Sequence, residues 1–325
     1  MALVNVGVFL ALLGCLEIGA RVFFPRDFRA VFNDPDMFVR GRPFVTSDAE
    51  RGFALKPGYE GSGCRVNAAG FRGPELPRDL GDRKRVLALG ESSTFGWMVD
   101  DDETWPAQVQ RLLGADESLV VINGGVPSYT SAQVLIYLRQ LLPRLDPDVV
   151  IVMVLWNDVL YSCIDNWFPE LLVIQQPARW RQILLRHSGL YRALLLRKDR
   201  DGPAEDVKNP EALAYFRDNL TRIARECEEQ GIELVLVHPA VHASRIPESG
   251  MKIGPRTVSQ EFFIELLDDF ARVLDEVAAE YAVPLVRHRL SIGNAVQDSF
   301  FLDPAHPSRS GHKLVAEEIA STLSH

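Results

Sequence analysis

The sequence contains little cysteine and no excess of positive charge, and both shortages exclude classes of protein. Its 325 residues include only four cysteines, with no C-x-x-C pair and no histidine nearby at ligand spacing. A zinc site is therefore not expected. Buried thiols are the favoured interpretation, although a disulfide between Cys64 and Cys163 stays open. The net charge of −9 argues against nucleic acid as a partner, because phosphate-binding surfaces need an excess of lysine and arginine.

Long apolar runs are also scarce, except at the amino terminus. Residues 1–16 carry no charged side chain, and the apolar pattern resumes at 22–24 after Glu17 and Arg21. A membrane span needs about 20 residues, and this segment reaches that length only by including the two charges, which can pair or snorkel. We expect residues 1–24 to form a membrane anchor. A cleaved signal peptide is the rival, although a basic start and a clean cleavage site are missing.

Residues 25–80 show little periodicity and are rich in Pro, Gly, Arg and Asp. Residues 67–74, with the sequence NAAGFRGP, form a dense turn signal. We expect an irregular, partly β lead-in that packs on the main domain. Within it, Phe71 and Arg72 could line a substrate pocket, but covering a sheet edge is the favoured interpretation.

From residue 81 to 325, short apolar runs alternate with amphipathic helical patterns. This alternation predicts an α/β domain with a parallel sheet that helices cover on both faces. The apolar runs predict strands at 86–89, 119–122, 149–155, 233–237 and 283–286. Capping residues predict helices after Thr104, Asn209 and Ser259, and further helices are expected at 132–142 and 310–323.

A helical insert is expected at about 159–205, where tryptophan and leucine are mixed with arginine. A basic amphipathic helix can lie on an anionic membrane or form a lid over an acyl site. A helix packed on the sheet with a solvated basic face is the more common outcome.

Polar residues follow the predicted strands at the end where parallel sheets bind ligands. Glu91, Ser92 and Ser93 come directly after the strand at 86–89. A serine at the end of a central strand is well placed to be a nucleophile, although a Ser/Thr-rich helix cap explains this stretch alone equally well. The other polar loops contain Asn123 and Ser128, then Trp156, Asn157 and Asp158, and then His238, for which a structural role is favoured.

A further polar cluster, Asp303-Pro-Ala-His306, lies near the carboxyl terminus. With this spacing on a proline-bounded turn, the carboxylate can accept the Nδ1–H of the imidazole. Nε2 is then free to take a proton.

These blocks resemble the four blocks of the SGNH (GDSL-type) hydrolases in their order along roughly residues 81–325. The lead-in is similar to that of membrane-anchored bacterial members. The resemblance implies a flavodoxin-like, three-layer α/β/α sandwich around a five-stranded parallel sheet. The matching residues are Gly90–Thr94, Asn123 with Ser128, Asn157 with Asp158, and Asp303 with His306.

The resemblance also implies hydrolysis of acyl esters or thioesters with no metal and no organic cofactor. It assigns Ser92 as the nucleophile, His306 as the general base and acid, and Asp303 as the orienting acid. The implied oxyanion hole comprises the N–H of Ser92, the N–H of Ser128 and the side chain of Asn157. Residues considered as substrate contacts are Glu91, Ser93, Trp156, Asp158 and His238.

Three positions depart from the family pattern. Glu91 stands where aspartate is usual, and Leu155 stands where a glycine is usual. Ser128 replaces the glycine of the second block, so a side chain crowds the pocket and the position can demand an unfavourable backbone angle.

The expected function is that of a membrane-anchored serine esterase acting on an acylated glycan or lipid, an O-acetyl ester being one candidate. Two alternatives stay open: an O-acyltransferase, and a catalytically silent binding module of an envelope-polymer pathway. Sidedness also stays open. Arg21, Arg26 and Arg29 would keep the globular part in the cytoplasm by the positive-inside rule, whereas the resemblance suggests the extracytoplasmic side.

Overall fold

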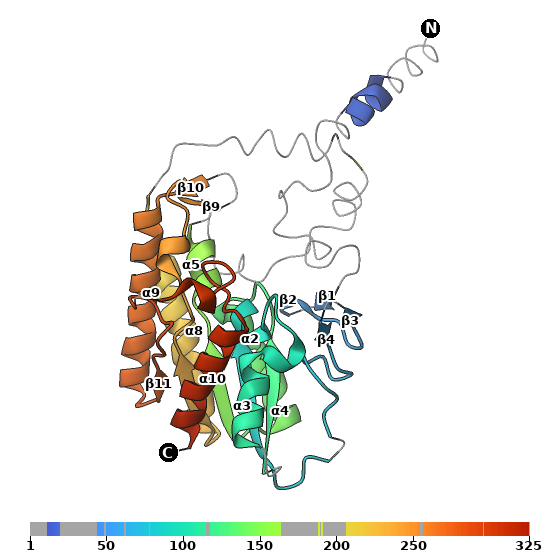
Figure 1. Ribbon diagram of the computed structural model, residues 1–325, viewed down its shortest axis with the longest axis vertical. Helices are drawn as coiled ribbons and strands as arrows, with labels where there is room; N and C mark the ends of the chain where they lie inside the picture. Colours follow the sequence, from blue (N-terminus) through green and yellow to red (C-terminus); the bar gives the residue numbers. More distant parts are fainter. Residues whose placement is uncertain are drawn as a thin grey trace.

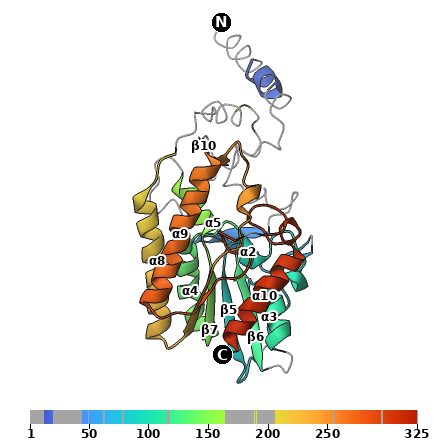
Figure 2. The ribbon, with the colours of Figure 1, turned by 60° about the vertical axis from the view of Figure 1, so that its left-hand side comes forward.

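A five-stranded parallel sheet forms the centre of the computed structural model, with the strand order β11–β8–β7–β5–β6 (Figures 1 and 2). Its strands are β5 (Lys84–Gly90), β6 (Leu119–Gly125), β7 (Val149–Met153), β8 (Glu233–Val237) and β11 (Leu285–Val286). The structure describes residues 12–19, 44–48, 50–61, 63–77, 79–114, 118–163, 188, 190, 206–253, 256–294 and 296–324. The predicted α/β fold with five parallel strands is confirmed.

Helices cover both faces of the sheet and give the predicted three layers. They are α2 (Ser92–Phe95), α3 (Trp105–Leu113), α4 (Ser131–Leu145), α5 (Trp156–Ser162), α8 (Pro210–Glu229), α9 (Gln260–Glu280) and α10 (Arg309–Leu323). Successive side chains of a strand point to opposite faces. Accordingly, Leu87 and Leu89 of β5 belong to the core that contains α4, α8 and α9, whereas Val86 and Ala88 belong to the core that contains α3 and α10. Figure 2 shows these two helical layers on either side of the strands.

The predicted capping residues begin three of these helices. Thr104 Oγ1 accepts the N–H of Ala107, and Ser259 Oγ accepts the N–H of Phe262. The side chain of Asn209 accepts the N–H groups of the two residues that open α8 after the proline. These oxygens satisfy N–H groups that lack partners within the helix.

The element boundaries differ from the sequence-based ranges in several places. Strand β7 ends at Met153, and β11 contains only two residues. Helix α4 continues through Pro143 to Leu145, whose side chain is buried. A hairpin of β9 (Met251–Ile253) and β10 (Arg256–Val258) was not expected, because its strands are too short to show a period. Short 3₁₀ turns lie at Asp101–Glu103, Ala243–Arg245 and Asp298–Phe300.

The described part of the lead-in forms two small antiparallel pairs. Strand β1 (Val45–Asp48) pairs with β2 (Gly52–Leu55), and β3 (Glu60–Gly61) pairs with β4 (Cys64–Arg65). Further along, the backbone N–H of Arg72 donates to the carbonyl of Asn123 on the edge strand β6 over 3.1 Å. Phe71 is buried and stacks on Tyr137 of α4. The lead-in therefore covers a sheet edge at the position favoured from the sequence.

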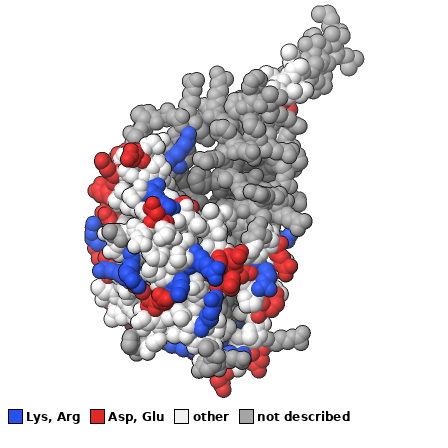
Figure 3. Space-filling view, in the orientation of Figure 1, with Lys and Arg blue, Asp and Glu red and all other residues white. Residues whose placement is uncertain are grey.

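Several expectations fall wholly or partly outside the described residues. Residues 12–19 are helical, but the remainder of the expected anchor at 1–24 is not described, nor is most of the insert at 159–205. Within the described residues, no helix has the length and apolar character needed to cross a bilayer. No disulfide joins Cys64 to Cys163, so the pairing left open from the sequence is not formed. On the face in Figure 3, acidic and basic side chains are intermixed over the described part of the chain.

Candidate active site

Ser92 lies at the carboxyl end of the central strand β5, at the first position of the one-turn helix α2. This helix approaches the end of β6 very closely. A Cβ at Gly125 would overlap the backbone of Thr94 and Phe95. Glycine at position 125 therefore lets the turn that carries Ser92 lie against the sheet.

The structure brings Ser92, His306 and Asp303 into one hydrogen-bonded row. Nε2 of His306 lies 2.8 Å from Oγ of Ser92, and Nδ1 of His306 lies 2.6 Å from Oδ2 of Asp303. The two ring nitrogens thus have the separate partners expected from the Asp-x-x-His spacing. The His306 side chain is 18% exposed.

The loop that carries His306 is fixed by the same carboxylate. Oδ1 of Asp303 accepts the N–H groups of Ala305 and His306 over 2.8 and 2.9 Å. Burial alone would raise the pKa of the Asp303 carboxyl, but the hydrogen bond and charge of His306, together with these N–H donors, hold the pKa below its ordinary value. The carboxylate therefore stays ionised near neutral pH.

Ser93, considered as a substrate contact, is used to join two loops. Its hydroxyl is buried and donates to the carbonyl of Ala305 over 3.0 Å. This bond ties α2 to the loop of Asp303 and His306, so the expectation of a substrate contact is corrected.

Ser128 adopts the left-handed backbone conformation that its replacement of glycine suggested. Its φ is +67°, a region that a residue with a Cβ enters only at a cost. The residue is half-buried in the loop between β6 and α4. The second-block position therefore has a glycine-like backbone although it carries a serine.

Asn157 lies near the start of α5, next to the Ser128 loop. Its side-chain amide donates to the carbonyl of Tyr129 over 2.9 Å, which joins the two loops implied for the oxyanion hole. A primary amide has two N–H groups, so this bond leaves Asn157 a second donor.

Glu91 is buried and connects the nucleophile turn to α5. Its two carboxylate oxygens accept the N–H groups of Trp156 and Asn157, each over 3.0 Å. Burial raises the pKa of the Glu91 carboxyl to about 8, and the charge of Asp158 adds to the rise, whereas the N–H donors oppose it. A substrate contact by Glu91 is corrected, because both oxygens are occupied inside the protein.

Asp158 is also buried, and it fixes the start of α4. Its carboxylate accepts the N–H of Ser131 over 2.9 Å and the hydroxyl of Ser131 over 2.6 Å. Burial raises the pKa of Asp158 to about 7, against the effect of these hydrogen bonds. The expected substrate contact by Asp158 is corrected for the same reason as that by Glu91.

Trp156 and His238 differ in their surroundings. Trp156 is half-buried and packs edge-to-face on Phe263, 5.2 Å between ring centroids. His238 is buried at the end of β8, with Nε2 2.8 Å from Oδ1 of Asp275 on α9. Burial lowers the pKa of His238, while Asp275 opposes the change. A substrate contact by His238 is corrected in favour of the structural role, whereas Trp156 remains a candidate.

Sequence reasoning did not single out Ser131, which joins Asp158 to Asn219 of α8 through its hydroxyl. The available signal was the capping pattern Thr130-x-x-Gln133, which marks the start of a helix at this point. Across the part of the chain that the structure describes, no three His, Cys, Asp or Glu side chains are grouped so that they could hold a metal ion.

The family model of the GDSL-like lipase/acylhydrolase family matches residues 88–314, which is more than half of the chain. The chain belongs to this family. The matched range includes Ser92, Asp303 and His306, whereas the whole lead-in at 25–80 lies outside it.

Similar proteins are distant in sequence. An arylesterase of Vibrio mimicus is 32% identical over 78 residues, which is 24% of this chain and 39% of that enzyme. The matched segment thus spans less than half of the curated relative. The crystal structure of TesA covers 74% of this chain at 20% identity, with a TM-score of 0.48 and 98% of its own chain covered. A lipase/acylhydrolase from Enterococcus faecalis gives 19% identity and a TM-score of 0.47, over 74% of this chain and 95% of its own.

Replacing Ser128 by glycine is expected to stabilise the fold. The substitution removes a cost of about 1–2 kcal/mol for the left-handed backbone of the folded state. It also increases the conformational entropy of the unfolded chain, which opposes folding by roughly 0.5–1 kcal/mol. The net gain is up to about 1.5 kcal/mol, which corresponds to a rise in Tm of up to about 2 °C for a chain of this length. Calorimetry measures it, with Ser324→Gly as control, because Ser324 has a φ of −88° and offers no relief. A Tm lowered by Ser128→Gly would contradict the argument.

Proposed function

We propose that this chain is a serine esterase that hydrolyses acyl esters through Ser92, His306 and Asp303. The observation that carries the proposal is the 2.8 Å contact between Nε2 of His306 and Oγ of Ser92. A hydroxyl at this distance from an imidazole nitrogen can transfer its proton as it attacks a carbonyl. Membership of an acylhydrolase family supports the same reaction.

In the proposed mechanism, Oγ of Ser92 attacks the ester carbonyl carbon while His306 takes the hydroxyl proton. The tetrahedral intermediate collapses when His306 gives this proton to the departing alcohol, which leaves an acyl-serine. Water then attacks with His306 as base, releasing the acid and restoring the serine. Asp303 keeps Nδ1 protonated and stabilises the imidazolium.

The negative oxygen of the intermediate needs fixed donors, usually the largest single catalytic contribution. We assign the N–H groups of Ser92 and Ser128 and the free N–H of Asn157. The hydrogen bond from the Asn157 side chain to the Tyr129 carbonyl supports this set, because it holds Asn157 beside the loop that contains Ser128.

Two buried acidic side chains hold the backbone next to these donors. Glu91 holds the N–H of Asn157, and Asp158 holds Ser131 at the end of the Ser128 loop. We infer that both residues position the donors rather than bind substrate. Displacement of a reacting or donor group by about 1 Å can cost about 10²-fold in rate.

For the substrate, we propose an acylated glycan or lipid. For the location, we propose a membrane anchor in residues 1–24 with the catalytic domain on the extracytoplasmic side. The uncharged run at 1–16 and the resemblance of the lead-in to anchored bacterial members support these proposals.

Labelling with a fluorophosphonate tests the nucleophile. The wild type is expected to label covalently, and Ser92→Ala is expected not to, because the Ser92 hydroxyl lies 2.8 Å from Nε2 of His306, whose Nδ1 is held by Asp303. Ser244→Ala is the matched control and should retain the label, since the Ser244 hydroxyl lies 3.1 Å from another imidazole, that of His242, away from the end of β5. Gel fluorescence measures the outcome. No label on the wild type would favour the catalytically silent binding module.

Replacing Asp303 by asparagine should lower kcat on p-nitrophenyl acetate by up to about 10⁴-fold, because the amide favours the wrong tautomer of His306. Because the pKa of Asp303 is lowered, its carboxylate becomes protonated only when the pH falls below the ordinary pKa of an aspartate. The difference in kcat between Asp303→Asn and the wild type should therefore persist throughout pH 5–9.

Asp298→Asn is the control, since exposed Asp298 pairs with another imidazole, that of His242, over 2.7 Å. Equal kcat values for Asp303→Asn and the wild type would remove Asp303 from the mechanism.

Replacing Glu91 by methionine fills a similar volume but leaves two buried N–H groups without an acceptor. We expect kcat to fall by about 100-fold, and by about 10-fold for Glu91→Gln, which keeps one acceptor oxygen. Glu233→Gln is the control, because Glu233 pairs with Lys84 at the opposite, exposed end of β5. Steady-state kinetics decide, and an unchanged kcat for Glu91→Met would exclude the positioning role.

A further inference from the structure

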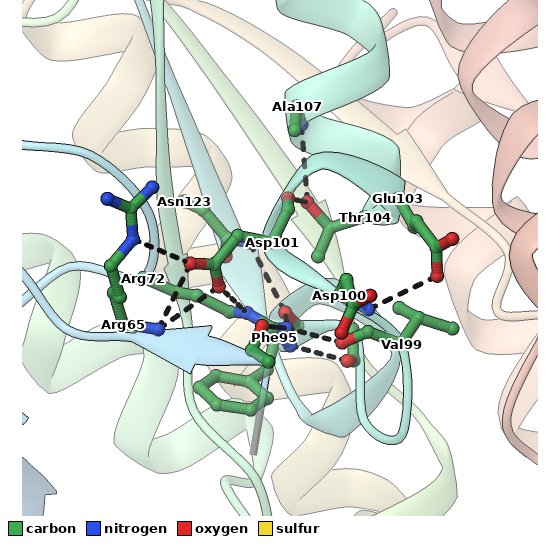
Figure 4. A network of polar contacts seen from close by, with 12 residues as sticks. Arg65, Arg72, Phe95, Val99, Asp100, Asp101, Glu103, Thr104, Ala107 and Asn123 are labelled. Carbon is green, nitrogen blue, oxygen red and sulfur yellow. Dashed lines mark hydrogen bonds and ion pairs between the residues drawn. The ribbon is translucent and has the colours of Figure 1, made fainter. Parts of the chain in front are cut away.

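Arg72 of the lead-in reaches into the main domain and ends against the turn that carries Ser92. Figure 4 shows its guanidinium among backbone carbonyls, with Asp101 beside it. The Arg72 side chain is only 2% exposed. Residue 72 also lies outside the range 88–314 that the family model matches.

The two Nη atoms of the guanidinium donate to carbonyl groups at the end of α2 and just after it. Nη1 donates to Phe95 over 2.8 Å and also to Gly96, and Nη2 donates to Val99 over 2.6 Å. The plane of the group lies over the Phe95 ring, 4.4 Å from its centroid. The last carbonyls of a helix have no partner within the helix, so Arg72 supplies the missing donors for α2.

These contacts lead directly to Ser92. The N–H groups of Gly96 and Trp97 both donate to the Ser92 carbonyl, over 2.8 and 3.0 Å. Gly96 makes its bond with a φ of +87°, which glycine adopts readily. Gly96 thus donates to Ser92 through its N–H and accepts from Arg72 through its carbonyl. One residue connects the guanidinium to the proposed nucleophile.

Arg72 is itself held firmly. Its Nε donates to Oδ1 of Asp101 over 3.0 Å, and its backbone N–H donates to the carbonyl of Asn123 of β6. The side chain of Asn123 also reaches the Phe95 carbonyl, at 3.4 Å. The lead-in, the edge strand and the end of α2 therefore meet at one point.

We propose that Arg72 is a positioning residue for Ser92, so that the lead-in completes the active site; this rests on the proposed esterase function. A planar guanidinium donates in several fixed directions at once, which a lysine ammonium on a flexible stem does not reproduce. Displacement of a reacting group by about 1 Å can cost about 10²-fold in rate. Arg72 thus acts on the rate through Ser92, without touching substrate.

The test compares Arg72→Lys and Arg72→Met with Arg65→Lys and Arg65→Met. Arg65 is the matched control, because its Nε contacts the same Asp101 carboxylate over 3.2 Å while its side chain is 56% exposed. Active sites are counted by fluorophosphonate titration, and kcat per titrated site and KM are measured on p-nitrophenyl acetate. Thermal unfolding of each variant is recorded in parallel.

We expect kcat per site to fall by about 10-fold for Arg72→Lys and about 100-fold for Arg72→Met, with KM within about threefold and both Arg65 variants near the wild type. A lower Tm with an unchanged kcat per site would overturn the proposal, since that is the result of a structural role alone. Absence of folded protein for both Arg72 variants would also overturn it, because the role would then belong to the whole fold. A wild type that does not label would instead overturn the esterase function, and this inference with it.

Discussion

The buried carboxylate of Glu91 joins two parts of the site that belong to different strands. It directly precedes Ser92 at the end of β5, and its oxygens hold the first N–H groups of α5, which follows β7. Without Glu91, the pairing of the strands would fix only the first residues of the two loops. With it, the backbone before the proposed nucleophile and the backbone of Asn157 form one rigid unit.

The remaining loops are attached to this unit by a few buried polar side chains. Asp158 connects α5 to Ser131 at the start of α4, and Ser93 connects α2 to the carbonyl of Ala305. Each contact joins chain segments far apart in the sequence, in the second case by 212 residues. The parallel sheet brings these loops to one edge, and the polar contacts then set their relative positions to within hydrogen-bonding distance.

Sequence patterns were informative where the cause of a structure is local. The apolar run at 149–155 predicts a central strand because every residue of β7 is buried, and the glycine position taken by Ser128 predicts a strained φ. Hydrogen-bond partners could not be predicted where they lie far apart in the sequence. Nothing near Glu91 indicates that it accepts N–H groups 65 and 66 residues away, and nothing near Arg72 indicates the carbonyls of α2.

Arg72, Glu91 and Asp158 are ionisable groups that each hold backbone N–H or carbonyl groups inside the protein, and this role explains why they are buried. Removing a charge from water opposes folding unless hydrogen bonds compensate, and apolar residues of similar volume often serve stability as well. An apolar side chain, however, cannot hold a backbone N–H or carbonyl in a set direction. Strand β7 needs no such group, because its ladder satisfies its backbone. The loops have no ladder, so these buried polar side chains do there what strand pairing does within the sheet.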